Sequence, residues 1–173
     1  MRVVCVPSTP ALLPAYASRE DPIAALREAV AAAIAWLPAG QVSVLTADAS
    51  PAAKRVAATL LGDRTGLPYD PDDRGLLVVA NGTATRTEKA PGHLDERAEE
   101  FDAGLRAGLA AGDPGVLAGT DVALGAELWC PDAPAFVGLG RTVVDGTVTS
   151  ARIDYDDDPY GVQYWVARWQ CRS

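Results

Sequence analysis

Histidine is nearly absent from this chain, which has a single one, His93, among 173 residues. A site that holds iron or zinc through two histidines, including the His-Glu-x-x-His arrangement, therefore cannot be built from this sequence. Cysteine is almost as scarce, with three widely spaced residues, Cys5, Cys130 and Cys171, and no Cys-x-x-Cys pair. We expect neither a zinc knuckle nor a disulfide framework, and unpaired thiols favour a reducing compartment.

The chain also lacks a long apolar run and an excess of basic residues. Its longest apolar stretch, around Ala29 to Leu37, is too short to cross a bilayer. The first apolar stretch ends at Pro7 after four residues, so we expect no signal peptide. The formal net charge of −8 argues against nucleic acid or an anionic membrane as the main partner. We therefore expect a cytoplasmic protein with neither of these partners.

Several nucleotide-binding and catalytic motifs are missing. There is no G-x-x-x-x-G-K-[ST] sequence, which excludes a P-loop, and there is no G-x-S-x-G nucleophile elbow. The segment GLGRTV at 138–143 lacks the third glycine of a dinucleotide-binding turn and does not follow the first predicted strand. These absences remove the common nucleotide-binding and serine hydrolase classes.

What remains is typical of one globular domain. The apolar share of 49% is high enough for a folded core, and the length suits a single domain over residues 1–173. β-branched runs predict strands over 2–6, 42–47 (a buried strand) and 75–80. Two further β-rich runs, 147–155 and 161–169, flank DDDPYG and predict a terminal hairpin.

Helical spacing and capping residues separate these strands. Asp21-Pro22 predicts a helix start before the apolar positions 23, 26, 30, 34 and 37, and Ser50-Pro51 opens a short helix that Gly62 closes. A loop spans 62–75, a longer amphipathic helix 94–111, and two shorter helical pieces reach Trp129. We expect an α/β fold: a three-layer sandwich with a mostly parallel, mixed central sheet, flanking helices and a C-terminal β-hairpin.

Polar residues follow each of the first three predicted strands. Ser8 and Thr9 stand in the first loop, Asp48 in the second, and Asn81 in the turn Asn81-Gly82-Thr83 after the third. Because parallel strands bring their carboxyl ends to one edge of the sheet, we expect Ser8, Asp48 and Asn81 to share one pocket there.

A dense group of charged residues lies between the third strand and the long helix. It contains Lys89, His93, Asp95 and Glu96 around the turn Ala90-Pro91-Gly92. Backbone N–H groups at the helix start, with Lys89, favour a small anionic ligand, whereas acidic residues in a first turn are also ordinary helix capping. Both interpretations stay open, as does a general-base role for His93.

The clustered aspartates and tryptophans near the C-terminus have simple structural interpretations. The run Asp154 to Asp158 lacks the glycine and terminal glutamate of a calcium-binding loop and predicts a solvated turn. Trp165 and Trp169 fall on one face of the last strand and Tyr164 on the other. We expect these aromatics to pack in the core, and on an edge strand they could instead form a homo-oligomer contact.

Three segments together resemble an actinobacterial subgroup of the class III extradiol ring-cleavage dioxygenase family: VPSTPALLP at 6–14, RTEKAPGHLDERAEEFD at 86–102 and YDDDPYGVQYWVARW at 155–169. The resemblance covers most of the chain and implies an α/β fold related to the ring-cleaving chain of protocatechuate dioxygenase-type enzymes. Those enzymes cleave rings with a non-haem iron(II) held by two histidines and a carboxylate.

The chain departs from those enzymes at the metal ligands. Where the resemblance implies a histidine in each of the first two loops, this sequence has Ser8 or Thr9 and then Asp48, a set that suits at best a loosely held Mg²⁺. We expect no metal site, no iron and no other cofactor. The sequence favours a ligand- or partner-binding protein without iron-dependent ring cleavage. The alternative is an enzyme of different, metal-independent or Mg²⁺-dependent chemistry in the same crevice.

Overall fold

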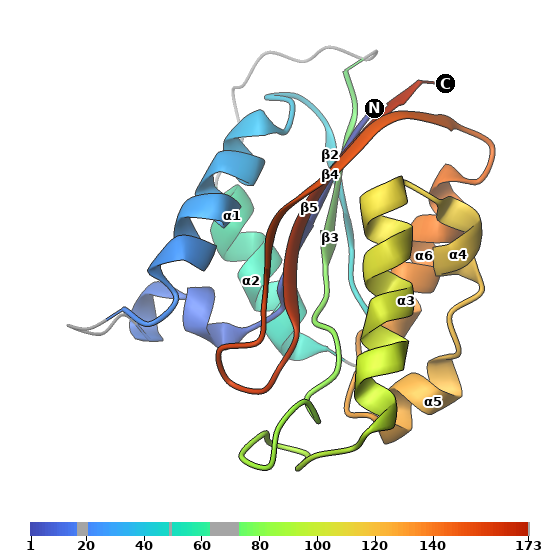
Figure 1. The fold of residues 1–173 in the computed structure, drawn as a ribbon. Coiled ribbons are helices and arrows are strands. Elements are labelled where there is room, and N and C mark those ends of the chain that lie inside the picture. The colour runs from blue at the N-terminus through green and yellow to red at the C-terminus, as the bar shows by residue number, and fades with distance from the viewer. Residues whose placement is uncertain (17–20, 49, 63–72, 173) are drawn as a thin grey trace.

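A computed structural model describes residues 1–16, 21–48, 50–62 and 73–172 (Figure 1). Its centre is a mixed five-stranded sheet in the order β2-β3-β1-β5-β4. The strands are β1 (Arg2–Val6), β2 (Val42–Leu45), β3 (Gly75–Val79), β4 (Thr147–Asp157) and β5 (Tyr164–Arg172). β1, β2 and β3 are parallel, whereas β5 runs antiparallel to β1 and forms a hairpin with β4. The mixed sheet and the terminal hairpin are as the sequence predicts.

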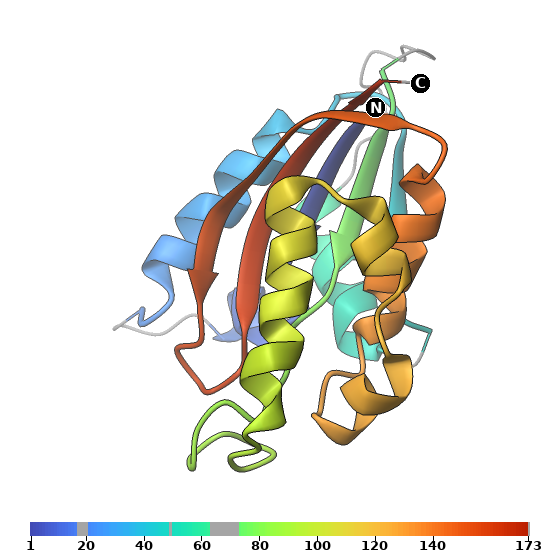
Figure 2. The ribbon, with the colours of Figure 1, turned by 45° about the vertical axis from the view of Figure 1, so that its right-hand side comes forward.

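Helices cover both faces of this sheet and complete a three-layer α/β fold. One face carries α1 (Ala24–Trp36) and α2 (Pro51–Leu61), with short 3-10 turns at Pro10–Leu12 and Pro14–Tyr16. The other face carries α3 (Arg97–Ala111), α4 (Pro114–Ala118), α5 (Val122–Glu127) and α6 (Ala133–Val143), as the turned view in Figure 2 shows.

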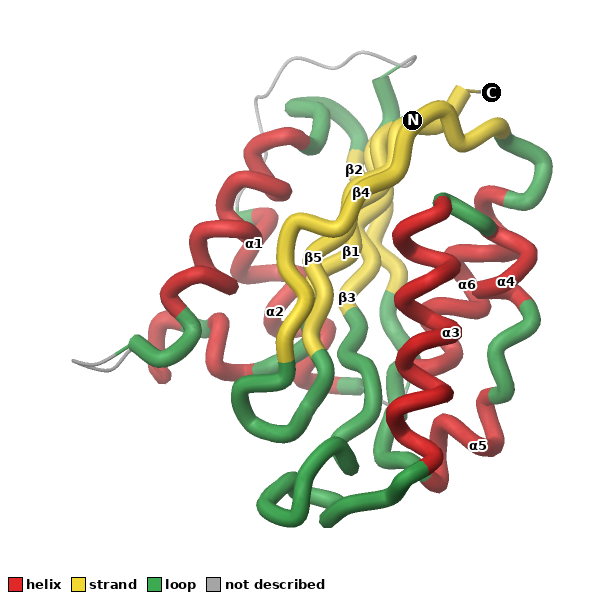
Figure 3. The backbone as a smooth tube through the Cα atoms, in the orientation of Figure 1, coloured by secondary structure: helices red, strands yellow, loops and turns green. Residues whose placement is uncertain are grey.

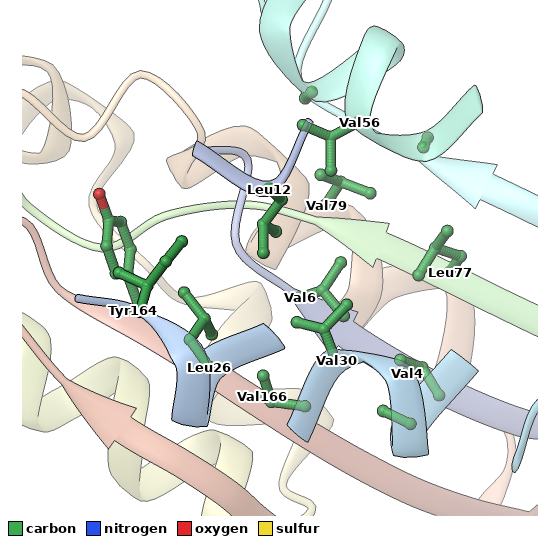
Figure 4. Close-up of a cluster of buried hydrophobic side chains, with 14 of the residues drawn as sticks. Val4, Val6, Leu12, Leu26, Val30, Val56, Leu77, Val79, Tyr164 and Val166 are labelled. Carbon is green, nitrogen blue, oxygen red and sulfur yellow. The ribbon is translucent and has the colours of Figure 1, made fainter. Parts of the chain in front are cut away.

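Alternation along the strands divides the core between the two faces. Val4 and Val6 of β1 pack with α1 and α2 in a mainly aliphatic cluster (Figure 4). Val3 and Cys5 point the opposite way, toward α3, α4 and α6. β1 lies between β3 and β5, and helices pack on both faces of the sheet there, which explains its continuous apolar sequence.

The last strand behaves as its alternation predicts. Tyr164 and Val166 join the α1–α2 cluster, while Trp165 and Trp169 pack on the other face and are fully buried. The Trp169 indole N–H donates to the carbonyl of Leu109 at 2.7 Å. β5 is an interior strand, so the tryptophans serve the core and do not form a surface for contact between copies.

Some sequence-based boundaries need correction. The sequence predicts a buried β2, but it is an edge strand in which Ser43 and Val44 are exposed. The first helix begins at Ala24, because the Asp21 side chain accepts from the N–H of Ile23 and caps a turn that precedes the helix. The long helix starts at Arg97, since the segment before it is held by turns. Most of the expected loop over 62–75 lies outside the described residues.

Two larger features differ from the sequence-based prediction. α6 is absent from that prediction, although it supplies a large share of the second core cluster. The acidic run lies mostly on β4 and not in a turn, and its carboxylates are bonded: Asp154 accepts from Arg168 at 2.6 Å and Asp156 from the Trp165 indole at 2.9 Å. These two aspartates therefore tie β4 to β5, the two strands of the hairpin.

The parallel strands bring three loops to one end of the molecule. Val6 lies beside Val79, and Leu45 beside Val78, so β1, β2 and β3 end at nearly the same level. This is the lower end in Figure 3, where the β3–α3 loop, α5 and the β4–β5 turn also gather.

Candidate functional site: a pocket at the carboxyl ends of β1 and β3

A pocket of about 530 Å³ opens at this end of the sheet. It is lined by residues from the β1 and β3 loops, α5, the α5–α6 connection and the start of β5: Thr9, Pro10, Asn81, Ala84, Ala126, Trp129, Pro131, Val162 and Tyr164. Most of these side chains are apolar, with a few hydrogen-bonding groups among them. Its size and this mixture are typical of a site for a small organic molecule.

A buried hydrogen-bond network stands behind one wall of the pocket. The N–H of Ser8 donates to Oδ1 of Asn81 at 2.8 Å, and the N–H of Asn81 donates to Oδ2 of Asp132 at 3.1 Å. The Ser8 hydroxyl donates to the same Asp132 oxygen at 2.5 Å. The other carboxylate oxygen, Oδ1, is buried and has no hydrogen-bond partner among the described residues. This network joins the first loop, the third loop and the start of α6.

Two hydroxyls face each other at another part of the wall. The Tyr164 hydroxyl lies 3.3 Å from Oγ1 of Thr9, and both side chains are largely buried. Figure 4 shows the Tyr164 hydroxyl directed away from the aliphatic cluster against which its ring packs. Burial raises the pKa of Tyr164, although the hydrogen bond with Thr9 acts in the opposite direction. The tyrosine is thus a neutral phenol at physiological pH.

Trp129 forms an exposed wall of the pocket, and its backbone conformation is unusual. Its φ of 54° is in the left-handed region, which is rare for a bulky residue and costs about 1–3 kcal/mol. The side chain is 56% exposed and lines the pocket. A Cβ added at Gly92 would lie 2.8 Å from Cγ of Trp129, so the backbone of Gly92 packs directly against the indole. The β3–α3 loop therefore positions this wall.

The structure brings together three of the residues that the sequence nominated. Ser8, Thr9 and Asn81 lie at this pocket, Thr9 and Asn81 in its lining and Ser8 behind it. Asp48 follows β2 at the same end of the sheet, but it is exposed and does not belong to the lining. Its backbone carbonyl accepts from Lys54 at 3.1 Å. Asp48 fails to reach the pocket because β2 is the edge strand and β3 separates it from β1.

The charged residues of the β3–α3 loop lie elsewhere. Lys89 and His93 are exposed, and Nδ1 of His93 lies 3.4 Å from the carbonyl of Glu88. Asp95 and Glu96 line a different cavity, together with Arg86, Leu94, Ala98 and Glu99. Asp95 accepts from the backbone and guanidinium of Arg97, which lowers the pKa of its carboxyl. Arg86 is the one basic residue among the described residues that line this cavity, against the carboxylates of Asp95, Glu96 and Glu99, so the cavity does not favour an anion.

A second buried carboxylate, Asp102 on α3, lies apart from the pocket. It accepts from the N–H of Thr83 at 3.0 Å and from the Thr83 hydroxyl at 2.6 Å, and Arg86 lies 3.7 Å away. Burial raises the pKa of Asp102, and the bonds from Thr83 and the charge of Arg86 only partly oppose this. Both oxygens are used within the fold, so Asp102 holds the loop after β3 onto α3.

The three cysteines are buried, unpaired and poorly reactive. Burial, together with the nearby Asp132 charge, raises the pKa of Cys5 to about 12. Burial likewise raises the pKa of Cys130, whose Sγ lies 3.4 Å from the carbonyl of Asn81, and that of Cys171. Thiols in this state are not nucleophiles at neutral pH.

The acidic, histidine and cysteine side chains around the pocket are few and scattered. Among the described residues, no three His, Cys, Asp or Glu side chains form a group that could hold a metal ion. Asp132 contributes one carboxylate, but its neighbours Ser8 and Asn81 already bond to it or to each other. His93 is exposed and does not line the pocket.

Sequence reasoning misses Asp132 and Trp129, and it assigns Tyr164 to the core or, on an edge strand, to a contact between copies, but not to a pocket. The predicted helical pieces end at Trp129, and the next segment, Cys130 to Pro134, carries no prediction. Its Pro-Asp-Ala-Pro sequence combines an aspartate with a proline at the second helical position, which is a helix-start signal. That signal could have revealed α6 and with it Asp132.

The structure is an α/β sandwich with a pocket at the carboxyl edge of its parallel strands. A scan against models of known protein families finds no match to this chain, and a search of curated proteins finds none either. Across the described ranges, no helix has the length and apolar character needed to cross a membrane.

Proposed function

We propose that this chain is a class III extradiol dioxygenase-like protein that lacks the ring-cleaving iron site and binds a small organic ligand. The three sequence segments that resemble the actinobacterial subgroup of this family support the assignment, and an α/β sandwich is the fold that the resemblance implies. With one histidine in the chain, we propose neither iron nor another cofactor.

The observation that carries this proposal is the pocket of about 530 Å³ at the carboxyl ends of β1 and β3. Ligands of open α/β sheets bind at this edge, where loops from neighbouring strands converge. Its wall is held by bonds among Ser8, Asn81 and Asp132 that join distant parts of the chain, so it is largely preformed.

The second candidate is an enzyme of different chemistry at the same edge. The 2.5 Å hydrogen bond from the Ser8 hydroxyl to Asp132 is the observation in its favour. Against it, Ser8 is buried behind the lining, and Asp48 and Lys89 lie outside the pocket. Ligand binding thus remains the function that we put first.

A pocket-filling variant tests the proposal. Ala126 on α5 lines the pocket, whereas Ala123 on the same helix is exposed and does not. We expect native mass spectrometry of gently purified protein to detect a bound small molecule that Ala126→Trp loses and Ala123→Trp retains. If none of the three proteins shows a mass above that of its own polypeptide, and denaturing removal of small molecules changes the thermal stability of none of them, ligand binding here is contradicted.

The partner class is proposed from charge and the location from the cysteines. With a net charge of −8, we propose that the partner is neither nucleic acid nor a membrane. The three widely spaced, unpaired cysteines support a cytoplasmic location. A protein partner or a second copy of the chain remains a subordinate proposal, which size-exclusion chromatography with light scattering tests directly.

A further inference from the structure

We infer that the ligand of this pocket is an uncharged molecule with a flat apolar body and a carbonyl-type oxygen. The oxygen is recognised by Asn81 and Thr9, and the body is covered by Trp129. This inference rests on the proposed function and narrows it, because it replaces the small anion suggested by the charged β3–α3 loop with a neutral class.

The charge around the pocket disfavours an anion. None of the described residues that line it carries a charged side chain. Immediately behind the lining, the buried Asp132 carboxylate is bonded to Ser8 and Asn81, and a negative ligand would be repelled by it. A cation would find no exposed carboxylate in the lining. A neutral ligand is the class that this surface accepts without an unpaired buried charge.

Asn81 lines the pocket with an amide group that, within the described part of the chain, is bonded at one end only. The Ser8 N–H can only donate, so the Asn81 atom 2.8 Å away from it must be the oxygen Oδ1. The amide nitrogen Nδ2 is then the free end, and it has no hydrogen-bond partner among the described residues. Because Asn81 lines the pocket, this nitrogen is positioned to donate to a ligand oxygen.

The Thr9–Tyr164 pair adds a second donor. The two hydroxyls share one hydrogen bond, which uses one of their two O–H groups. The N–H of Ala11 also points at Oγ1 of Thr9, at 3.4 Å, and occupies acceptor capacity. One hydroxyl hydrogen is left to donate. A ligand acceptor such as a carbonyl oxygen matches these donors, whereas a ligand without an acceptor leaves them unpaired.

Trp129 supplies the apolar surface for a flat ligand body. Its indole packs on the backbone of Gly92 and borders the pocket, while Ala84, Pro131 and Val162 complete an apolar lining. Aromatic side chains stack favourably on flat rings. The strained φ of Trp129 is consistent with a backbone held in place to present this ring.

Three matched probes test the inference: benzamide, which is neutral and has a carbonyl oxygen, benzoate, which is its anionic counterpart, and toluene, which has no acceptor. Binding is read from the indole N–H signal of Trp129 in a ¹H–¹⁵N spectrum, assigned by its loss in Trp129→Phe. Trp165 and Trp169 are internal references, because their indoles are bonded to Asp156 and Leu109. We expect benzamide to bind about tenfold or more tighter than benzoate.

Two variants separate recognition of the oxygen from simple apolar binding. Asn81→Asp keeps the acceptor for the Ser8 N–H but removes the amide donor, and Thr9→Val removes a hydroxyl at nearly constant volume. Each variant is expected to bind benzamide about fivefold more weakly than the wild type and to bind toluene with unchanged affinity. If the indole signals of Trp165 and Trp169 show that Asn81→Asp is misfolded, the comparison is made with Thr9→Val alone.

The outcomes are distinct. Benzoate binding as tightly as benzamide, or benzamide binding that ignores Thr9→Val, overturns the neutral-carbonyl inference while the pocket still binds a ligand. If none of the probes moves the Trp129 signal at its solubility limit, the inference is also overturned. The proposed function is then decided separately by the Ala126→Trp comparison in native mass spectrometry.

Discussion

The Ser8 hydroxyl donates a 2.5 Å hydrogen bond to Oδ2 of Asp132, across 124 residues of sequence and between two buried side chains. Because the other Asp132 oxygen has no partner among the described residues, this bond and the one from the N–H of Asn81 are the described contacts that satisfy the carboxylate. A buried carboxylate with so few donors is sensitive to the loss of any one of them.

Replacement of Ser8 by alanine is therefore predicted to destabilise the fold. We expect Ser8→Ala to lower the free energy of unfolding by about 1–3 kcal/mol, measured by urea denaturation. Ser43→Ala, at an exposed position of β2, is the matched control and should change it by less than about 0.5 kcal/mol. Equal effects of the two substitutions would mean that the Ser8–Asp132 bond does not stabilise the folded state.

Asp102 gives a prediction of pH dependence. Burial raises the pKa of its carboxyl above the ordinary value of 3.8. An acid with a higher pKa in the folded state stabilises that state while protonated, so this contribution is complete below about pH 3.8 and is lost as the pH rises through the folded pKa. We expect the stability of the wild type relative to Asp102→Asn to fall as the pH rises from about 3.8 toward neutrality.

The measurement is urea denaturation of both proteins across that range. Asparagine keeps an acceptor for the N–H of Thr83 and can donate to its hydroxyl, so the variant should fold. A stability difference that rises with pH would show that the bonds from Thr83 and the charge of Arg86 outweigh burial.

The strands and part of the pocket could be predicted from the sequence, because they depend on local residue patterns and on the parallel arrangement of β1 and β3. Apolar runs located all five strands of the observed sheet, and the rule that parallel strands share a carboxyl edge brought Ser8, Thr9 and Asn81 to one pocket. The same rule misplaced Asp48, because it does not say which strand lies at the edge. Strand order depends on packing among helices that are distant in sequence.

The rest of the candidate site could not be predicted because it depends on long-range packing. Trp129 and Asp132 enter the site through α5 and α6, and no fixed spacing relates them to Asn81. α6 itself contains two glycines and β-branched residues, which have low helix propensity. Its glycines contribute by allowing close approach: Gly138 packs on Leu45, and Gly140 packs on the backbone of α4.

That close approach predicts opposite effects for two glycine-to-alanine substitutions. A Cβ at Gly140 would collide with the carbonyl oxygen of Pro114 and lie 2.5 Å from the N of Ala118, so α4 and α6 would have to separate. We expect Gly140→Ala to cost about 1–3 kcal/mol. Gly104 on α3 has open space around it, and Gly104→Ala should gain about 0.5–1 kcal/mol. Thermal denaturation of both variants checks the signs, and a stabilising Gly140→Ala would refute the packing.

The left-handed backbone of Trp129 leads to a comparison of two small replacements. At a φ of 54°, alanine suffers the same steric conflict as tryptophan, whereas glycine does not. Since both variants lose the whole indole, the lost ring contacts cancel. Trp129→Gly should therefore be more stable than Trp129→Ala by about 1 kcal/mol in urea denaturation.

The control is Ala110 on α3, an exposed helical position with ordinary backbone geometry. There glycine is expected to be the less stable of the two residues, with Ala110→Gly costing about 1 kcal/mol, because helix propensity favours alanine. The preference between glycine and alanine thus reverses between positions 110 and 129. An alanine preference at both would mean that the backbone at 129 is not held left-handed in solution, and that the indole is free to leave the pocket wall.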